Sequence, residues 1–266
     1  SRSSFDWGVP VEFDNGHVIY VWIDALSNYI TVLGYPDQDI SDSWPADTQV
    51  IGKDIMRFHA GIWPTILLAL GLPLPKNLLV HGFVTVDGQK MSKSIGNVVD
   101  PADILEKHGL VPLRYFIARH GSATDDVDFT WDKYEASYNE LANDLGNLVQ
   151  RLSTLCGKNG VKALEVEQKD IPEFVERMDK YEFNAAFEII WGKIQELNKR
   201  IDEEKPWSLA KTDPEKAVEV LTNLSQDLID LCPYLAIFIP DTAKQIEDVF
   251  TAKEISAPKT PLFPKN

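Results

Sequence analysis

The chain has 266 residues, of which 44% are hydrophobic and 25% charged, so it can bury sizeable cores and is not a disordered polypeptide. Its 26 basic and 41 acidic side chains give a net charge of −15, which excludes loose, charge-driven attraction to nucleic acid. No run of about 18 apolar residues spans a bilayer and no secretory signal opens the sequence, so we expect a cytoplasmic protein with no membrane partner.

Strands alternate with helices over the first third of the chain, which predicts a parallel or mixed α/β sheet. Ligands of such sheets bind at the carboxyl ends of the strands. The third strand ends in an Asp87-Gly88 turn. We expect strands at 17–23, 48–51 and 78–86, the first of them buried, and helices at 24–33 and from Ile55 to Leu67.

The second half of the chain carries long segments of 3.6-residue periodicity and is predicted to be a helical bundle. Helices are expected at 131–155, 172–203 with an interruption near Lys180, 214–232 and 233–250. Residues 94–130 read as a connecting subdomain with short helices around Ile104 and Arg114, and residues 256–266 as a tail. The domains are therefore expected at 1–93, 94–130 and 131–266. The two cysteines, Cys156 and Cys232, are predicted to be buried free thiols, and no Cys-x-x-Cys pair offers a zinc site.

Two lysines lie on a loop after the third strand, in Lys90-Met91-Ser92-Lys93-Ser94. This pentapeptide resembles the second signature of class I aminoacyl-tRNA synthetases, whose loop closes over the ATP triphosphate. The resemblance implies that Lys90 and Lys93 bind ATP and are catalytic, because two ammonium groups stabilise the charge that grows on departing pyrophosphate. A solvated Lys/Ser turn is the alternative, and the strand-then-loop setting disfavours it.

Two aromatic-rich segments upstream, residues 22–29 and 52–64, resemble methionyl-tRNA synthetase, in which they line the amino-acid pocket. A thioether offers no charge, so a site that selects it needs shape and polarizable aromatic walls. The resemblance places on the methionine side Trp22, Ala25, Leu26, Tyr29, Ile55, His59 and Trp63. Leu26 stands where some members carry proline. Ordinary core packing is the alternative for these side chains, and we favour it for Phe58 and Ile62.

Gly52 and Asp54 lie at a strand-to-helix turn, where a glycine lets a ligand approach the backbone and a carboxylate accepts hydrogen bonds from ribose hydroxyls. The resemblance puts both near the ATP sugar, although Asp54 can also be a helix N-cap. It puts His81 and Val84, from the third strand, beside the adenine. Mg²⁺ is expected to accompany ATP, and no protein metal site is expected.

Three asparagines, Asn139, Asn143 and Asn147, recur at four-residue spacing and therefore share a helix face. The family recognises the anticodon with its helical bundle. The resemblance therefore implies that Asn139, Asn143 and Trp207 contact the anticodon. Arg151, one turn further, can meet a phosphate. The alternatives are a polar helix face and a hydrophobic staple behind Pro206.

None of the five histidines begins the His-x-Gly-His tetrapeptide that the family uses as its first signature. The resemblance therefore implies the second half of a class I Rossmann-like nucleotide-binding fold, a connecting subdomain and a C-terminal anticodon-binding bundle. The implied activity is that of a methionine–tRNA ligase acting on ATP, L-methionine and tRNA. We expect it to need the missing N-terminal half of the catalytic domain. The alternatives are a non-catalytic tRNA-binding module and a class I synthetase for leucine, isoleucine, valine or cysteine.

Overall fold

The computed structural model describes residues 7–92 and 94–264, and it divides into two compact units, Ser1–Gly82 and Phe83–Asn266. Each unit has a core of its own. The first is built around Leu26, Ile30, Trp63 and Leu67, and the second is much larger and lies within the helical bundle. Among the described residues, no helix combines the length and the apolar character needed to cross a bilayer.

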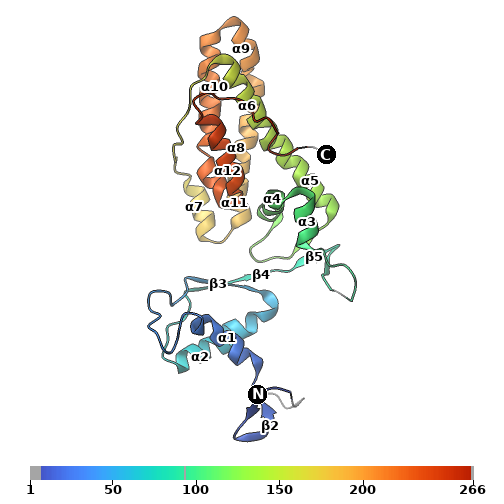
Figure 1. Ribbon diagram of the computed structural model, residues 1–266, viewed down its shortest axis with the longest axis vertical. Helices are drawn as coiled ribbons and strands as arrows, with labels where there is room; N and C mark the ends of the chain where they lie inside the picture. The colour runs from blue at the N-terminus through green and yellow to red at the C-terminus, as the bar shows by residue number, and fades with distance from the viewer. Residues whose placement is uncertain (1–6, 93, 265–266) are drawn as a thin grey trace. The chain divides into compact units, whose positions relative to one another are not determined.

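Unit 1 is a small α/β structure. In chain order it contains β1 (Pro10–Val11), β2 (Asp14–Val18), α1 (Val21–Thr31), β3 (Thr48–Gly52), the 3-10 turn η1 (Lys53–Ile55), the π-helical turn η2 (Phe58–Ile62), α2 (Trp63–Ala69) and β4 (Asn77–His81) (Figure 1). β1 pairs with β2 in an antiparallel hairpin, and β3 pairs with β4 in parallel. The strands thus form two separate pairs in this unit.

The buried strand predicted at 17–23 is wrong. β2 ends at Val18, which is its only buried residue, and α1 already begins at Val21. Leu26 and Ile30, four residues apart, are the buried residues of α1, so the helical period decides the structure of this stretch. The β-branched and aromatic run that suggested a strand is partly the first turn of that helix.

The third strand, predicted as one element over 78–86, is divided. Residues Asn77–His81 pair with β3, whereas Val84–Val86 pair with β7 (Val127–Phe129). The amide of Phe83 donates to the Asp126 carboxylate at 2.8 Å. The pairing is interrupted at Gly82 and Phe83 because the two halves of the segment have different hydrogen-bonding partners.

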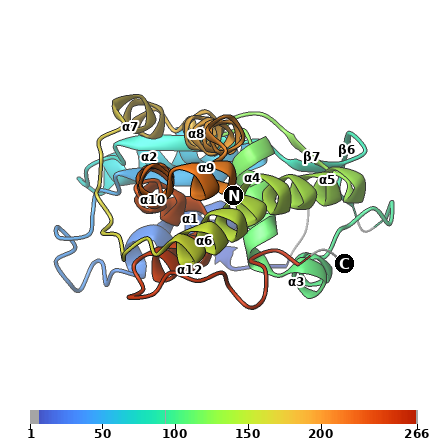
Figure 2. The same cartoon turned by 90° about the horizontal axis from the view of Figure 1, so that it is seen from above.

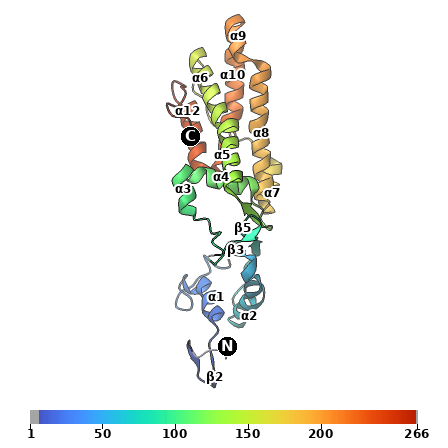
Figure 3. The same ribbon diagram turned by 90° about the vertical axis from the view of Figure 1, so that its right-hand side faces the viewer.

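Unit 2 begins with a three-stranded sheet and continues as helices. It contains β5 (Val84–Val86), β6 (Gln89–Lys90), α3 (Pro101–His108), α4 (Leu110–His120), β7, α5 (Trp131–Leu141), the π-helical turn η3 (Ala142–Gly146), α6 (Asn147–Asn159), α7 (Pro172–Asp179), α8 (Phe183–Glu204), α9 (Pro206–Thr212), α10 (Pro214–Ile229), α11 (Cys232–Phe238) and α12 (Pro240–Phe250). The helices α6, α8 and α10 run side by side (Figures 1 and 3), and α8 and α10 are seen nearly end-on in Figure 2.

Most helices of the bundle and the two connecting helices confirm the sequence prediction, including the break near Lys180. The single helix predicted at 233–250 is wrong: it divides at Ile239 into α11 and α12, because Pro240 has no amide hydrogen with which to continue α11. The helix predicted at 131–155 runs to Asn159 and contains the π turn η3. α10 ends at Ile229, three residues before the predicted end at 232, and α11 begins at Cys232, with Pro233 in its first turn. Both cysteines are buried free thiols, as predicted.

The segment after α12 is not a free tail over its described part. Ile255 and Phe263 are buried in the core of unit 2. The Tyr138 hydroxyl donates to the carbonyl of Pro264. A Cβ atom at Gly146 would lie 3.2 Å from the Phe263 ring, so the small residue in η3 makes room for that ring. The apolar side chains thus outweigh the proline content, on which the prediction of a tail was based.

Replacing Phe263 by alanine is expected to lower the free energy of unfolding by about 3 kcal/mol, since a buried aromatic ring is lost from a packed core. Chemical denaturation followed by circular dichroism measures this change. Lys259→Ala, at an exposed position of the same segment, is the control and should leave stability unchanged. Equal stability of the Phe263→Ala variant and the parent would contradict the packing described here.

Candidate functional site

Aromatic rings from α1 meet rings from η2 and α2 in unit 1. The Trp22 indole stacks on Phe58 with 4.1 Å between ring centroids, and it meets the His59 ring edge-on at 6.1 Å. Tyr29 lies 5.6 Å from His59 and 5.8 Å from Trp63. Trp63 is fully buried, whereas Tyr29 is 36% exposed. The structure therefore brings together all four rings of the predicted methionine pocket in one cluster.

Two hydrogen bonds select one tautomer of the neutral His59 ring. Its Nδ1 lies 3.0 Å from the Ile55 carbonyl, which only accepts, so Nδ1 carries the proton. In the neutral ring Nε2 is then an acceptor, and the Tyr29 hydroxyl donates to it at 2.9 Å. Burial raises the pKa of Tyr29 and keeps the phenol protonated. The imidazole is thus locked as an acceptor toward Tyr29.

The remaining predicted pocket residues differ in exposure. Leu26 is fully buried in the core of unit 1, Ile55 is half-buried beside it, and Ala25 is exposed. Phe58 is buried, and Ile62 packs against the same core, as the core interpretation of both expected. Sequence reasoning missed that Phe58 is also the stacking partner of Trp22. Its spacing in the helix gave no signal for that contact.

The carboxyl ends of β3 and β4 bring Gly52 and His81 side by side, because the two residues are partners in the parallel ladder. A Cβ atom at Gly52 would lie 2.8 Å from Asp54 Oδ1 and 3.8 Å from His81 Cε1. Asp54 lies in η1, which has Gly52 as its N-cap and no side-chain cap, so the N-cap alternative for Asp54 is wrong. Three of the predicted ATP-binding residues therefore lie together at the carboxyl ends of β3 and β4.

The predicted lysine loop lies in unit 2, on a hairpin of β5 and β6. Asp87 and Gly88 have φ values of 51° and 71°, as a two-residue type I′ turn requires. Lys90 ends β6, with its ammonium 4.0 Å from the centroid of the Phe83 ring. Val84 begins β5 and is half exposed. The second predicted lysine, Lys93, lies outside the described residues.

Asn97 bridges the backbone of this loop and was missed by sequence reasoning. Its Oδ1 accepts from the Ser92 amide at 2.8 Å, and its Nδ2 donates to the Lys90 carbonyl at 3.3 Å. The amide thereby closes the chain from residue 90 to 97. An asparagine shortly after a Gly with positive φ, here Gly96, is a turn signal that points to such a bridge.

The residues predicted to contact an anticodon lie on α5, η3 and α9. Asn139 and Asn143 are exposed, and the Asn147 amide lies 3.5 Å from the Asn143 side-chain oxygen. Trp207, in the first turn of α9, is 38% exposed. The Arg151 guanidinium lies 5.6 Å from the Trp207 ring centroid. The π turn η3, in which Asn143 lies, is a local irregularity of a kind that is frequent at functional sites.

Arg151 and Trp207 also line a shallow cavity of about 310 Å³, which sequence reasoning did not foresee. Its other walls are Gln150, Thr154 and Leu155 from α6. The carboxylate of Asp202 holds Arg151 at 2.5 Å, so the guanidinium is fixed beside the exposed indole. The cavity is open enough to receive a flat ring against Trp207.

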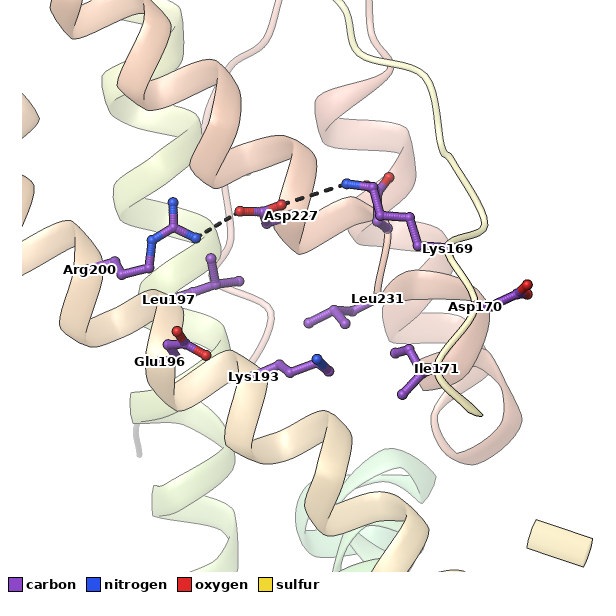
Figure 4. Close-up of a pocket in the computed structure, with 10 residues that line it drawn as sticks. Lys169, Asp170, Ile171, Lys193, Glu196, Leu197, Arg200, Asp227 and Leu231 are labelled. Atoms are coloured by element: carbon purple, nitrogen blue, oxygen red, sulfur yellow. Dashed lines mark hydrogen bonds and ion pairs between the residues drawn. The ribbon is translucent and has the colours of Figure 1, made fainter. Parts of the chain in front are cut away.

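A second cavity of the bundle, of about 320 Å³, is lined by charges that are largely paired (Figure 4). Lys169 contacts Asp230 at 2.6 Å, and Arg200 contacts Asp227 at 2.7 Å. The Glu167 amide also donates to Asp230 at 3.0 Å. The contacts of Lys169 and Glu167 hold the connector before α7 against the end of α10, and the Arg200–Asp227 pair joins α8 to α10. Across residues 7–92 and 94–264, no three His, Cys, Asp or Glu side chains gather as metal ligands.

Comparison with known proteins matches both halves of the chain. Residues 1–153 match the family model described as tRNA synthetases class I (M), and residues 154–261 match the anticodon binding domain of methionyl tRNA ligase. The chain belongs to the methionyl-tRNA synthetase family. The α/β unit followed by a helical bundle agrees with this membership and with the fold class expected from the sequence.

Several relatives are methionine–tRNA ligases. The chain is 44% identical to that of Caldanaerobacter subterraneus subsp. tengcongensis over 92% of its own length and 42% of the relative. It is 42% identical to that of Rickettsia bellii over 93% of its own length and 53% of the relative. The chain thus spans about half the length of these relatives. The crystal structure of the Mycobacterium tuberculosis methionyl-tRNA synthetase bound by methionyl-adenylate superposes with a TM-score of 0.82 at 32% identity, covering 99% of this chain and 59% of that one.

Removing the Tyr29 hydroxyl is expected to destabilise unit 1 by about 1–2 kcal/mol, because the buried Nε2 atom of His59 loses its donor. Urea unfolding of the Tyr29→Phe variant, followed by tryptophan fluorescence, measures the change. Tyr35→Phe, which removes a hydroxyl that takes no part in this pair, is the control. If both variants unfold at the same urea concentration, the assigned donor and acceptor are wrong.

Proposed function

We propose that this chain supplies the methionine pocket, part of the ATP site and the anticodon-binding bundle of a methionine–tRNA ligase. The observation that carries the proposal is the ring cluster of unit 1, with Tyr29 and His59 hydrogen-bonded at 2.9 Å beside Trp22 and Trp63. Membership of the family supports it. The cytoplasmic location expected from the sequence belongs to this proposal, because the family works in translation.

The methionine side chain would bind among Trp22, Ala25, Leu26, Tyr29, Ile55, His59 and Trp63. Because the Tyr29 proton is committed to His59, the sulfur would gain from ring contacts, worth roughly 0.3–1.5 kcal/mol each, rather than from a hydroxyl donor. The buried Trp63 indole N–H has no hydrogen-bond partner within its unit as described. Because the Tyr29 hydroxyl is already bonded to His59, recognition of the thioether would rest mainly on the shape and the polarizable surface of the rings.

ATP would lie with its ribose at Gly52 and Asp54 and its adenine at His81 and Val84. The methionine carboxylate would attack the α-phosphate, which forms methionyl-adenylate as the bond to pyrophosphate breaks. Lys90, together with Lys93, would stabilise the negative charge that grows on the departing pyrophosphate. Mg²⁺ would enter with ATP and be held largely by its phosphates, so no dedicated set of protein ligands is needed.

In the second step the methionyl group would pass from the adenylate to a hydroxyl of the terminal adenosine of tRNA, with release of AMP. Asn139, Asn143 and Trp207 would select the tRNA through its anticodon. Trp207 and Arg151 line a cavity that suits a flat base, and an amide can read base edges. Because the chain is acidic overall, specificity would come from unpaired bases more than from phosphates.

Trp207→Ala is expected to weaken binding of an anticodon stem-loop carrying the methionine anticodon roughly 10- to 100-fold, the usual worth of one stacked base. Fluorescence anisotropy with a labelled stem-loop and the 266-residue chain measures this. Trp7→Ala removes an indole that is 87% exposed in the other unit and serves as the control. Unchanged affinity of the Trp207→Ala variant would refute the anticodon assignment.

Adenylate formation is tested in a chimera in which this chain replaces the matching segment of the Caldanaerobacter subterraneus ligase. We expect the chimera to catalyse methionine-dependent pyrophosphate exchange, and Lys90→Ala to slow it by about 100-fold or more. Lys158→Ala, at an exposed position on α6, is the control. Exchange by Lys90→Ala at the parent rate would contradict the role of Lys90.

The 266-residue chain alone is assayed in parallel. We expect it to give no exchange, because it contains no His-x-Gly-His tetrapeptide. Robust turnover by the chain alone would show that its own residues suffice. Binding of the stem-loop without exchange by the chimera would instead favour a non-catalytic tRNA-binding module.

A further inference from the structure

Three residues of the small sheet in unit 2 stand in one row. Lys90 of β6 is the register partner of Thr85 in β5, and Thr85 is in turn the register partner of Asp128 in β7. Thr85 is buried, so the central position of the row is fixed within the sheet. The predicted catalytic lysine is therefore separated from Asp128 by a single strand.

The Asp128 carboxylate gathers donors from three places. The Thr85 hydroxyl donates to Oδ1 at 3.0 Å, and the Gly88 amide donates to the same oxygen at 2.7 Å. The Lys133 ammonium contacts Oδ2 at 2.7 Å. These donors, Lys133 first, lower the pKa of Asp128 to about 2. The carboxylate is therefore ionised throughout the neutral range and can hold all three donors at once.

The hairpin that carries Lys90 needs such an anchor. β6 has only two residues and pairs on one side, with β5 alone. A hairpin this short is marginal by itself. Asp128 binds β5, the central strand of the sheet, through Thr85, and it binds the turn of the hairpin through Gly88. A neighbouring carboxylate, Asp126, holds the Phe83 amide at 2.8 Å, and the Phe83 ring lies under the Lys90 ammonium.

We propose that Asp128 is a positioning residue for Lys90: it fixes the β5–β6 hairpin from outside and so sets where the Lys90 ammonium meets the phosphates of ATP. The consequence for the reaction rests on the proposed function, whereas the anchoring itself does not. Lys133 lies in the first turn of α5, so the anchor ties the hairpin to the helix that follows β7. In this role Asp128 acts through the Gly88 amide and the side chains of Thr85 and Lys133 rather than by contact with ATP.

Amide hydrogen exchange of the 266-residue chain tests the anchoring and requires no enzymatic assay. The Gly88 amide is expected to exchange at least about 10-fold faster in Asp128→Ala, because it loses an ionic acceptor. Thr85→Val and Lys133→Met each remove one donor and should give smaller increases. Asp132→Asn removes a charge from the exposed start of α5 and should change nothing. Gly88 exchange in Asp128→Ala at the parent rate would overturn the proposal.

Pyrophosphate exchange of the chimera tests the consequence. We expect Asp128→Ala to lower kcat about 10-fold with the KM for methionine unchanged, because a displaced ammonium weakens charge stabilisation alone. Unchanged kcat, or a joint loss of kcat, methionine affinity and thermal stability, would overturn the positioning role. A parent chimera without exchange would contradict the proposed function instead, and Gly88 exchange would still decide whether Asp128 anchors the hairpin.

Discussion

The interrupted strand around Gly82 is the constraint on which both candidate nucleotide-binding regions depend. Within ten residues of chain, Asn77–His81 pairs in parallel with β3 and Val84–Val86 pairs with β7. The first pairing sets His81 opposite Gly52 and thereby assembles the strand edge proposed for the ATP sugar. The second pairing fixes the hairpin that ends in Lys90. One segment therefore contributes both to the strand ends proposed to bind the adenosine of ATP and to the hairpin that carries Lys90, the lysine proposed to bind its phosphates.

Both proposed recognition helices contain a π turn at the residues proposed for recognition. η2 holds His59, and η3 holds Asn143. In each case a nearby side chain satisfies a carbonyl: His59 donates to Ile55, and Asn198 of α8 donates to Asp144 at 2.7 Å. A π turn shifts the following residues around the helix axis, so it re-aims side chains that a regular helix would direct elsewhere. These local departures are stabilised by the His59 and Asn198 side chains as donors.

Much of the architecture follows from periodicity. Most helices of the bundle, β3 and the Asp87-Gly88 turn agree with prediction because their patterns are long or chemically specific. The errors arose where tertiary pairing overrides local pattern. Residues 17–23 are rich in strand-forming side chains, yet the buried stripe of α1 decides their structure. The break at Gly82 depends on β7, which is more than 40 residues away, and no local signal contains that information.

The aromatic residues of the candidate site could be predicted from the sequence, whereas the residues that hydrogen-bond the lysine hairpin and its loop could not. The family resemblance named Trp22, Tyr29, His59 and Trp63, which the structure brings together. It did not name Asn97 or Asp128. Asn97 bonds the backbone of its own loop, whereas Asp128 bonds Thr85 and Gly88, which lie 43 and 40 positions earlier in the chain. The domain boundaries at 93 and 130 and the roles of the individual site residues stay predictions.

The central claim is that the ring cluster of unit 1 binds the methionine side chain and that the ends of β3 and β4 bind the adenosine. Calorimetry with a stable analogue of methionyl-adenylate tests it most directly, because this one ligand would contact both regions. We predict that the chimeric ligase binds the methionyl analogue at least roughly 10-fold more tightly than the leucyl counterpart, the scale that side-chain shape can provide. We also predict that Trp22→Ala removes this preference. Equal affinity for the two analogues, or a preference unaffected by the loss of Trp22, would contradict the account.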